Sequence, residues 1–306
     1  MTTLLVGRGL LGGHVEQRLR ATGEDVRTVR VPWQDHDAAL AALLEAADRA
    51  ARPPGSWRLA WCAGAGVVAT PGDALRAEAA LFRAFVAGLG EVPGALFLSS
   101  SAGGVYAGSS DGPPFTEESA PAALAAYGAT KLDMEDAVRG LAERGGRVVT
   151  GRIANLYGPG QALSKPQGLV SQLCLTQLTG QALGVYVSLD TLRDYLYVDD
   201  AAAMVVASLA RVEAEPPGAA VTKILASGRA VSVAALIGES GRVFRRRPRL
   251  ATRTDGTAQA RDLRLRSVVW PELDVLARTS LLVGLRATAD DVGRQLRAGA
   301  LRKAPA

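Results

Sequence analysis

Cysteine and histidine are scarce in this chain of 306 residues. Only two cysteines occur, Cys62 and Cys174, and they lie far apart in apolar settings. This predicts buried free thiols rather than a disulfide, as in proteins of a reducing cytoplasm. The two histidines are His14 and His36, and neither has a cysteine cluster nearby, so we expect no bound metal.

The chain also lacks a long apolar run, although apolar residues make up 48% of it. No segment is long enough to span a bilayer, and the N-terminus has neither the charged start nor the cleavage site of a signal peptide. The formal net charge of +5 would attract an anionic substrate, but no nucleic-acid-binding motif is present. We therefore expect a cytoplasmic protein that binds a small molecule, with neither a membrane nor a nucleic acid as partner.

The first twelve residues contain a glycine-rich turn. Residues 2–6 form a short apolar run typical of a strand, and the next six read Gly7-Arg8-Gly9-Leu10-Leu11-Gly12. This is G-x-G-x-x-G between a strand and a helix. Its glycines permit a tight turn and close approach of a pyrophosphate, and the helix N-terminus supplies amides and a positive dipole end. We expect a dinucleotide here; a tight turn without a ligand is the alternative.

Tyr127 and Lys131 stand four residues apart, about one helical turn, and therefore share a helix face. A lysine ammonium beside a phenol favours the phenolate, which suits a tyrosine to act as an acid or base near neutral pH. Three serines, Ser99 to Ser101, precede the pair at the end of a predicted strand. A hydroxyl there would hydrogen-bond the same substrate oxygen. The alternative is that the serines only satisfy backbone groups at the strand end.

Strands and helices alternate along the chain, which predicts a parallel sheet with helices on both faces. We expect strands at 2–6, 25–31, 57–62, 95–101, 147–154 and 221–226, and a strand-like run at 246–250. We expect helices at 13–22, 37–51, 73–89, 123–144, 168–180, 199–211 and 232–243. Ligands bind at the carboxyl ends of the strands in such a sheet. The residues expected to meet there in one crevice are Gly7, Ala63, Ser101 and Asn155.

This pattern predicts two closely associated structural units. We assign residues 1–155 to a Rossmann-type NAD(P)-binding domain with a doubly wound parallel sheet, to which 199–226 would return. After residue 155 the alternation is less regular. We assign 156–306 mainly to a smaller, interleaved α/β lobe that binds substrate.

Six segments together resemble the extended short-chain dehydrogenase/reductases, in particular the nucleotide-sugar epimerases, dehydratases and reductases. In family order these are the glycine turn at 7–12, Cys62-Ala63-Gly64, Leu96–Ser101 with Val105-Tyr106, Tyr127-Gly128-Ala129-Thr130-Lys131, Arg152–Gly160 and Arg193–Asp200. The resemblance covers nearly the whole chain. It implies that Tyr127 exchanges a proton with a carbinol oxygen while Lys131 holds the nicotinamide ribose. It also implies that Ser101 is the catalytic hydroxyl and contacts substrate, and that Ser99, Ile153 and residues 62–64 line the cofactor site.

The choice of cofactor depends on two arginines. An NAD-binding Rossmann unit usually has an acidic residue at the end of its second strand, where this chain has Arg30. Arg8 adds a second cation inside the glycine turn, and both favour the 2′-phosphate of NADP over NAD. A solvated surface arginine is the alternative for Arg30. Gln34 or Asp35 resembles the family's adenine-contacting position.

The resemblance also implies contacts to a substrate diphosphate. In nucleotide-sugar members the corresponding residues are Asn155 and Arg193, and a planar guanidinium suits bidentate contact with phosphate. The alternative for Arg193 is a structural ion pair with Asp194 or Asp199. The family's second phosphate arginine falls where its R-P-x-D pattern is broken to Gln259-Ala260-Arg261-Asp262, and we assign it to Arg261.

Some family features are missing. The helix at 73–89 lacks the cofactor-contacting asparagine of the 4-epimerases, and Gly66 stands near the position where those enzymes have a lysine. No acid pair of the dehydratase type follows Ser101. These absences favour an NADP-dependent ketoreductase of a nucleotide-linked keto-sugar or similar carbonyl compound. The alternatives are an epimerase with tightly bound NAD and a non-catalytic dinucleotide-binding protein. The family also implies a homodimer formed through the Tyr/Lys helix.

Overall fold

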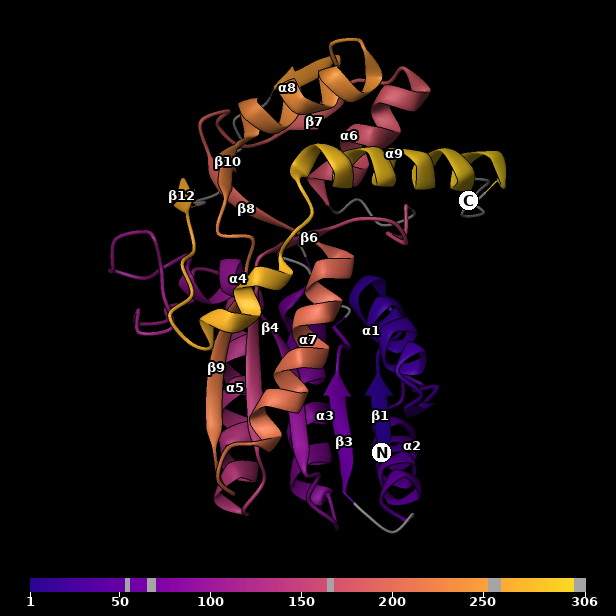
Figure 1. Ribbon diagram of the computed structural model, residues 1–306, viewed down its shortest axis with the longest axis vertical. Helices are drawn as coiled ribbons and strands as arrows, with labels where there is room; N and C mark the ends of the chain where they lie inside the picture. Colours follow the sequence, from indigo (N-terminus) through magenta and orange to yellow (C-terminus); the bar gives the residue numbers. More distant parts are fainter. Residues whose placement is uncertain (53–55, 65–69, 164–167, 253–259, 300–306) are drawn as a thin grey trace.

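The computed structural model describes residues 1–52, 56–64, 70–163, 168–252 and 260–299. Figure 1 shows a lower part built on a parallel sheet and an upper lobe of helices and short strands. None of the helices in the described ranges is both long and apolar enough to cross a membrane.

The central sheet confirms the predicted doubly wound, Rossmann-type fold. Its six strands pair in parallel throughout, in the order β2-β1-β3-β4-β5-β9. They are β1 (Thr2–Val6), β2 (Asp25–Thr28), β3 (Trp57–Trp61), β4 (Ala95–Ser101), β5 (Val148–Ile153) and β9 (Ala220–Leu225). The last strand comes from the second half of the chain. In the register of β4, β5 and β9, Ser101 lies beside Ile153, and Ile153 lies beside Leu225.

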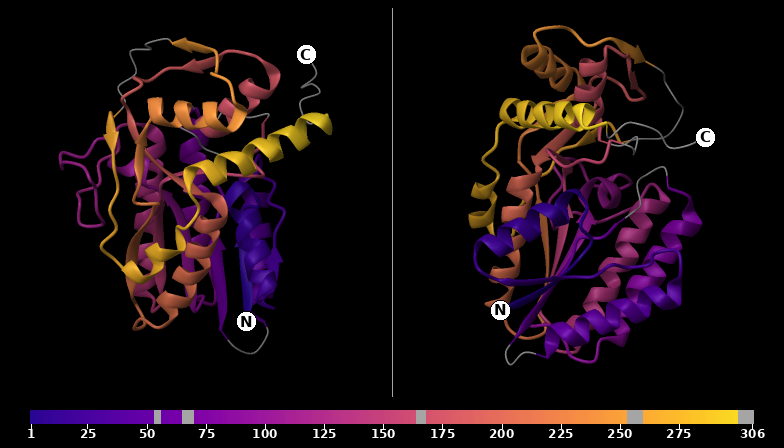
Figure 2. Two further views of the ribbon diagram at one scale, coloured as in Figure 1. Left: turned by 45° about the horizontal axis from the view of Figure 1, so that its top comes forward. Right: turned by 90° about the vertical axis from the view of Figure 1, so that its right-hand side faces the viewer.

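Helices cover both faces of the sheet because its strands are apolar on both faces. Helices α1 (Leu10–Ala21) and α7 (Val198–Glu213) pack on one face, where residues such as Leu5 point. Helices α2 (His36–Ala51), α3 (Gly72–Gly88) and α5 (Ala126–Glu143) pack on the other, where Leu4 points. The right-hand view of Figure 2 shows the two helix layers on opposite sides of the sheet.

The upper lobe has a core of its own. Helices α6 (Leu169–Thr179), α8 (Val233–Phe244) and α9 (Leu281–Arg297) share it with side chains such as Tyr157 and Tyr195. Its short strands are β6 (Asn155–Tyr157), β7 (Leu183–Val185), β8 (Leu192–Tyr197), β10 (Ala230–Ser232), β11 (Leu250–Thr252) and β12 (Asp262–Leu263). Strand β8 is the centre of a small sheet, because β6, β10 and β12 all pair with it.

The predicted elements are present, with ends that differ by a few residues, apart from the strand at 246–250. That prediction was wrong. Arg245 ends α8 in the left-handed conformation, with φ 53°, and the chain then turns before β11 begins at Leu250. The arginine-rich run is therefore a helix-terminating turn. Sequence reasoning also missed α9, although its apolar spacing and the Ser280 side chain, which accepts from the Val283 amide, are helix signals.

Candidate active site

The glycine turn is packed too tightly for side chains at two of its positions. Gly7 has φ +93°, and a Cβ on it would lie 2.4 Å from Ala63 Cα. A Cβ on Gly12 would lie 1.8 Å from the Gly7 carbonyl oxygen. Gly9, the N-cap of α1, differs, because no atom of another described segment lies within 4 Å of its Cβ position. A ligand can therefore approach the backbone at Gly9 closely, and the free amides at the start of α1 suit an anion such as a pyrophosphate.

The segment after β3 forms the wall beside this turn. The Cys62 amide donates to the Val6 carbonyl at 2.8 Å, which fixes residues 62–64 next to the turn. Burial raises the pKa of the Cys62 thiol to about 12, so it remains a protonated, unreactive group. Both cysteines are free thiols, as predicted.

Ser101 and Tyr127 approach each other through Gly104. Ser101 Oγ accepts a hydrogen bond from the Gly104 amide at 3.1 Å and so caps α4 (Ala102–Tyr106). The Tyr127 ring lies against Gly104, with Cδ1 and Cε1 3.2 Å from the position of a Cβ there. A Cβ on Gly128 would meet the Gly104 carbonyl oxygen at 2.1 Å, so α4 and α5 touch backbone to backbone. The Ser101 hydroxyl satisfies a backbone group, as the alternative held, yet it keeps its own proton for a further bond.

A buried polar network lies beneath these residues. Ser100 Oγ donates to Glu135 at 2.6 Å, and Glu135 pairs with Arg152 at 2.7 Å. Arg152 donates to the Tyr106 hydroxyl at 2.7 Å, and that hydroxyl donates to the Thr116 carbonyl at 2.8 Å. The network ties α5 to β4 and β5. Of the three serines, Ser100 is thus structural, while Ser99 pairs in register with Gly151 of β5.

Lys131 is buried but poorly satisfied. Its Nζ lies 5.8 Å from the centroid of the Tyr127 ring, 3.9 Å from Met134 Sδ and 3.6 Å from Glu78 Oε1. Within the described ranges, no oxygen lies at hydrogen-bonding distance from it, although an ammonium has three N–H donors. A cofactor hydroxyl would fill that deficit.

Glu78 was missed by sequence reasoning. It lies on the buried side of α3, among residues such as Leu75, Ala79 and Phe82. A charged residue on an otherwise apolar helix stripe was the available signal, because such a charge needs a buried partner.

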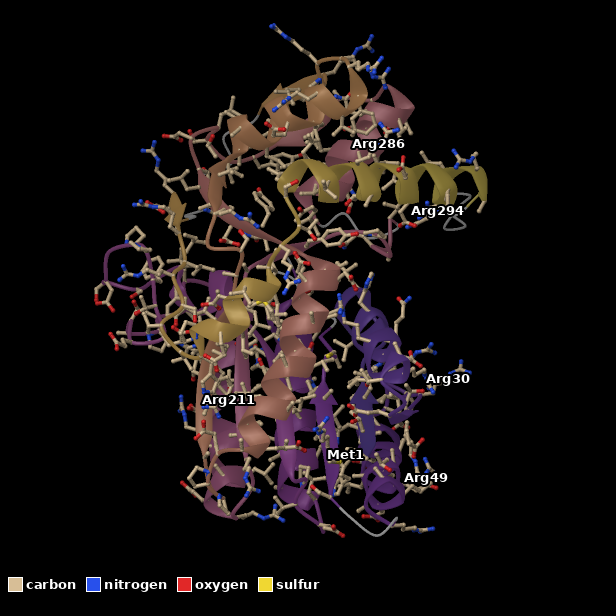
Figure 3. All side chains as sticks on the ribbon, in the orientation of Figure 1. Met1, Arg30, Arg49, Arg211, Arg286 and Arg294 are labelled. Carbon is tan, nitrogen blue, oxygen red and sulfur yellow. The ribbon has the colours of Figure 1, made fainter. Side chains whose placement is uncertain are left out.

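The residues predicted to surround the adenosine of the cofactor, Arg8, Arg30, Gln34 and Asp35, are exposed. Arg8 is 62% exposed and pairs with Glu16 at 2.7 Å. Arg30 lies two residues beyond β2, and Figure 3 shows it pointing away from the fold. In the part of the chain that the structure describes, its side chain makes no hydrogen bond or ion pair. Gln34 lies on the turn before α2, and Asp35 caps that helix by accepting from the Ala38 amide at 3.0 Å.

Arg193 is half-buried and has no carboxylate partner among the described residues. Its guanidinium donates to the Leu192 carbonyl at 2.8 Å, and burial lowers its pKa. The two acids considered as partners are engaged elsewhere. Asp194 accepts from backbone amides that include that of Ser227, and Asp199 pairs with Arg18 at 2.7 Å. Arg193 therefore has donors to spare for an anion.

Asn155 and Arg261, which were also predicted to bind substrate, lie beside β8, the strand that carries Arg193. Asn155 is exposed, and its Nδ2 donates to the Asp194 carbonyl at 3.1 Å. Arg261 precedes β12, which pairs with β8, but its exposed guanidinium forms an ion pair with Asp190. Gln259 and Gly66 lie outside the described residues.

Comparison with known proteins gives consistent matches. Residues 4–222 match the sequence profile of the NAD dependent epimerase/dehydratase family. A dTDP-4-dehydro-6-deoxyglucose reductase of Escherichia coli is 34% identical over 107 residues, which cover 34% of this chain and 33% of the reductase. A dTDP-L-rhamnose 4-epimerase of Burkholderia thailandensis is 29% identical over 201 residues, 65% of this chain and 47% of the epimerase. The chain thus matches less than half the length of either relative.

The fold is shared with solved structures over almost the full chain. The crystal structure of a UDP-glucose 4-epimerase from Thermotoga maritima with UDP-glucose superposes with a TM-score of 0.82 at 20% identity. The match covers 97% of this chain and 100% of that one. At this identity the likeness establishes the fold.

Proposed function

The chain belongs to the NAD-dependent epimerase/dehydratase family, and from this premise we propose that it is an NADP-dependent ketoreductase of a nucleotide-linked keto-sugar or similar carbonyl compound. One observation carries the proposal. Tyr127 lies against α4, the helix that Ser101 caps. Lys131 lies one turn after Tyr127 on α5, where it is buried with few hydrogen-bond partners among the described residues. These are the groups that a carbonyl reduction needs: a proton donor, a hydrogen-bond donor to the oxygen, and a cation.

The roles follow from the chemistry of each group. When bound, a reduced nicotinamide supplies a hydride to the carbonyl carbon. Tyr127 donates its phenolic proton to the carbonyl oxygen, and Ser101 hydrogen-bonds that oxygen as charge develops on it. Lys131 binds the hydroxyls of the nicotinamide ribose and stabilises the phenolate left on Tyr127. The amides at the start of α1, around Gly9, hold the pyrophosphate.

The preference for NADP rests on Arg8 and Arg30. Both are exposed, and Arg30 follows β2, the strand next to the one that leads into the glycine turn. A 2′-phosphate would draw Arg8 from Glu16 and give Arg30 its partner, with charge-assisted hydrogen bonds to both. Gln34 and Asp35 would lie beside the adenine.

The substrate assignment rests on Arg193. A half-buried guanidinium that has no carboxylate partner among the described residues fits a diphosphate, since its planar fork of N–H donors can form two parallel hydrogen bonds to phosphate oxygens. Asn155 contributes from the neighbouring strand β6, whose residue 155 pairs with Tyr195 of β8. Arg261 would join them only by exchanging Asp190 for the substrate.

An epimerase with retained NAD is the second candidate. The longer of the two matches to relatives is to a 4-epimerase, and the family profile is described as NAD dependent. Such an enzyme would use the same three side chains to oxidise and re-reduce one carbinol. A dinucleotide-binding protein that catalyses no reaction is the remaining alternative. The proposal also includes a homodimer that is formed through α5.

Two measurements test the proposed function together. Native mass spectrometry of the purified protein would identify a dinucleotide that co-purifies with it. Incubation with NADPH and a nucleotide-linked 4-keto-sugar would then be followed by the loss of reduced nicotinamide absorbance. Stoichiometric loss supports the ketoreductase. Isomerisation of the corresponding 4-hydroxy nucleotide sugar, without net change in reduced nicotinamide, supports the epimerase, and neither result with either cofactor contradicts both.

A further inference from the structure

A buried ion pair joins the two helices behind the nicotinamide end of the crevice. Lys131 of α5 and Glu78 of α3 approach to 3.6 Å, and their side chains are 5% and 13% exposed. A second ion pair joins the same helices at 3.7 Å, between Arg83 and Asp133, but these side chains are 61% and 58% exposed. The two pairs have nearly equal lengths and differ chiefly in their access to water.

The buried pair is poorly suited to a purely structural role. Removing two charges from water is costly, and the cost is repaid only with good geometry and further hydrogen bonds. At 3.6 Å the pair lies beyond ordinary hydrogen-bonding distance, and the only hydrogen-bond acceptor of Lys131 among the described residues is the Met134 sulfur at 3.9 Å. A pair of apolar side chains would join α3 to α5 at lower cost.

The pair also lies beside Gly64, just after the carboxyl end of β3. A Cβ built on Gly64 would lie 3.3 Å from Lys131 Nζ and 3.7 Å from Glu78 Oε1. Gly64 follows β3, next to the wall that packs on the glycine turn. Both charges of the pair therefore act on whatever occupies the space in front of Gly64.

We propose that Glu78 is a charge-balancing residue of the cofactor site, whose carboxylate offsets the buried Lys131 ammonium and thereby favours the oxidised, cationic nicotinamide. This inference rests on the proposed function only in placing Lys131 at the nicotinamide ribose, a placement that the ketoreductase and the epimerase share. Glu78 acts through the field at the ring and through Lys131; it is a positioning residue rather than a proton donor.

The sign follows from Coulomb's law. The oxidised nicotinamide ring carries one positive charge more than the reduced ring, and a lone ammonium beside it would repel the oxidised form. With Glu78 the pair is neutral, so the oxidised ring is no longer penalised. Because a buried charge is weakly screened, removal of one unit charge from the pair is expected to change the relative affinity by on the order of tenfold or more.

This balance bears on the kind of reaction. An enzyme that must keep its cofactor through both oxidation and reduction needs a site that holds both redox forms. A reductase that releases the oxidised cofactor gains nothing from binding it tightly. A measured role of Glu78 would therefore shift the balance of the two candidate functions toward the epimerase.

The test compares the affinities for the oxidised and the reduced cofactor. The parent, Glu78→Gln and the matched control Asp133→Asn are each titrated with NADP⁺ and NADPH, and with NAD⁺ and NADH, by calorimetry. Asp133→Asn removes a carboxylate between the same two helices, but at the exposed pair. Circular dichroism checks that every variant is folded.

Glu78→Gln is expected to weaken the oxidised form relative to the reduced form by about tenfold, whereas Asp133→Asn leaves the ratio as in the parent. Glu78→Asp, which keeps the charge, should restore most of the ratio, and Lys131→Met should move it the opposite way. Equal losses for both redox forms in Glu78→Gln would overturn the proposal and leave a structural ion pair. If Glu78→Gln does not fold, an unchanged ratio in Lys131→Met overturns it instead. A parent protein that binds no dinucleotide refutes the proposed function itself.

Discussion

The residues proposed to surround the nicotinamide and those proposed to surround the adenosine are held in different ways. At the nicotinamide end, Tyr127 is fixed by glycine contacts, Ser101 by a backbone bond and Lys131 by burial beside Glu78. Where the adenosine is proposed to bind, Arg8 and Arg30 are exposed, and within the described part of the chain Arg8 has an ion-pair partner while Arg30 has none. The groups proposed to react are thus held in place, while the groups proposed to choose the cofactor are free to rearrange. Changes at the first end should accordingly have larger effects than changes at the second.

The largest effect is expected from Tyr127→Phe. The variant loses the proton donor but keeps the ring that packs on Gly104, so the fold and cofactor binding should survive. Reduction should fall about 100- to 10,000-fold, the usual contribution of a general acid. Steady-state kinetics with a substrate that the parent turns over would measure it. Near-full activity would show that the preorganised end is not where the chemistry occurs.

The next effect is expected from Arg193→Ala, in the substrate lobe. Loss of a charged hydrogen-bond donor should raise KM for a diphosphate-linked sugar by about 10- to 100-fold. A small ketone that lacks phosphates should be affected far less, because it never reaches Arg193. Equal losses on both substrates would mean that the half-buried guanidinium serves the fold.

A smaller effect is expected from Arg30→Asp at the adenosine end. The parent should bind NADPH at least about tenfold more tightly than NADH, and the variant should reverse that order through repulsion of the 2′-phosphate. Arg49→Asp, at an exposed arginine of α2 that Figure 3 also labels, is the control and should leave the order unchanged. Fluorescence titration with both reduced cofactors decides between them. Tighter binding of NADH by the parent would end the NADP assignment.

The smallest effect is expected from Arg261→Ala. Its guanidinium is exposed and already paired with Asp190, so it has the least to offer a substrate. KM for the diphosphate-linked sugar should change by less than about threefold. A change as large as that of Arg193→Ala would show that the pair with Asp190 opens to bind phosphate.

Sequence reasoning was most accurate where one local pattern determines the structure. Gly7 and Gly12 of the turn have to be glycine because a Cβ at either position would collide with backbone atoms. The Tyr127 and Lys131 side chains share a face because the helix repeat requires it. The parallel sheet followed from the alternation of strands and helices.

The features that the sequence did not predict depend on contacts between distant segments. The Glu78–Lys131 pair joins residues 53 positions apart, and its position beside Gly64 depends on how α3 and α5 pack. The freedom of Arg193 depends on Asp194 and Asp199 finding other partners. The run at 246–250 was predicted to be strand-like, but it forms a turn because α8 ends at Arg245 in the left-handed conformation.

The most direct test of the central claim is to follow the hydride itself. The parent and Tyr127→Phe would be incubated with a nucleotide-linked keto-sugar and with NADPH that is deuterated at the hydride-donating carbon, and the sugar product would be analysed by mass spectrometry. The account predicts one deuterium on the new carbinol carbon in the parent and almost no product in the variant. Product formation by the parent without deuterium in the sugar would contradict it.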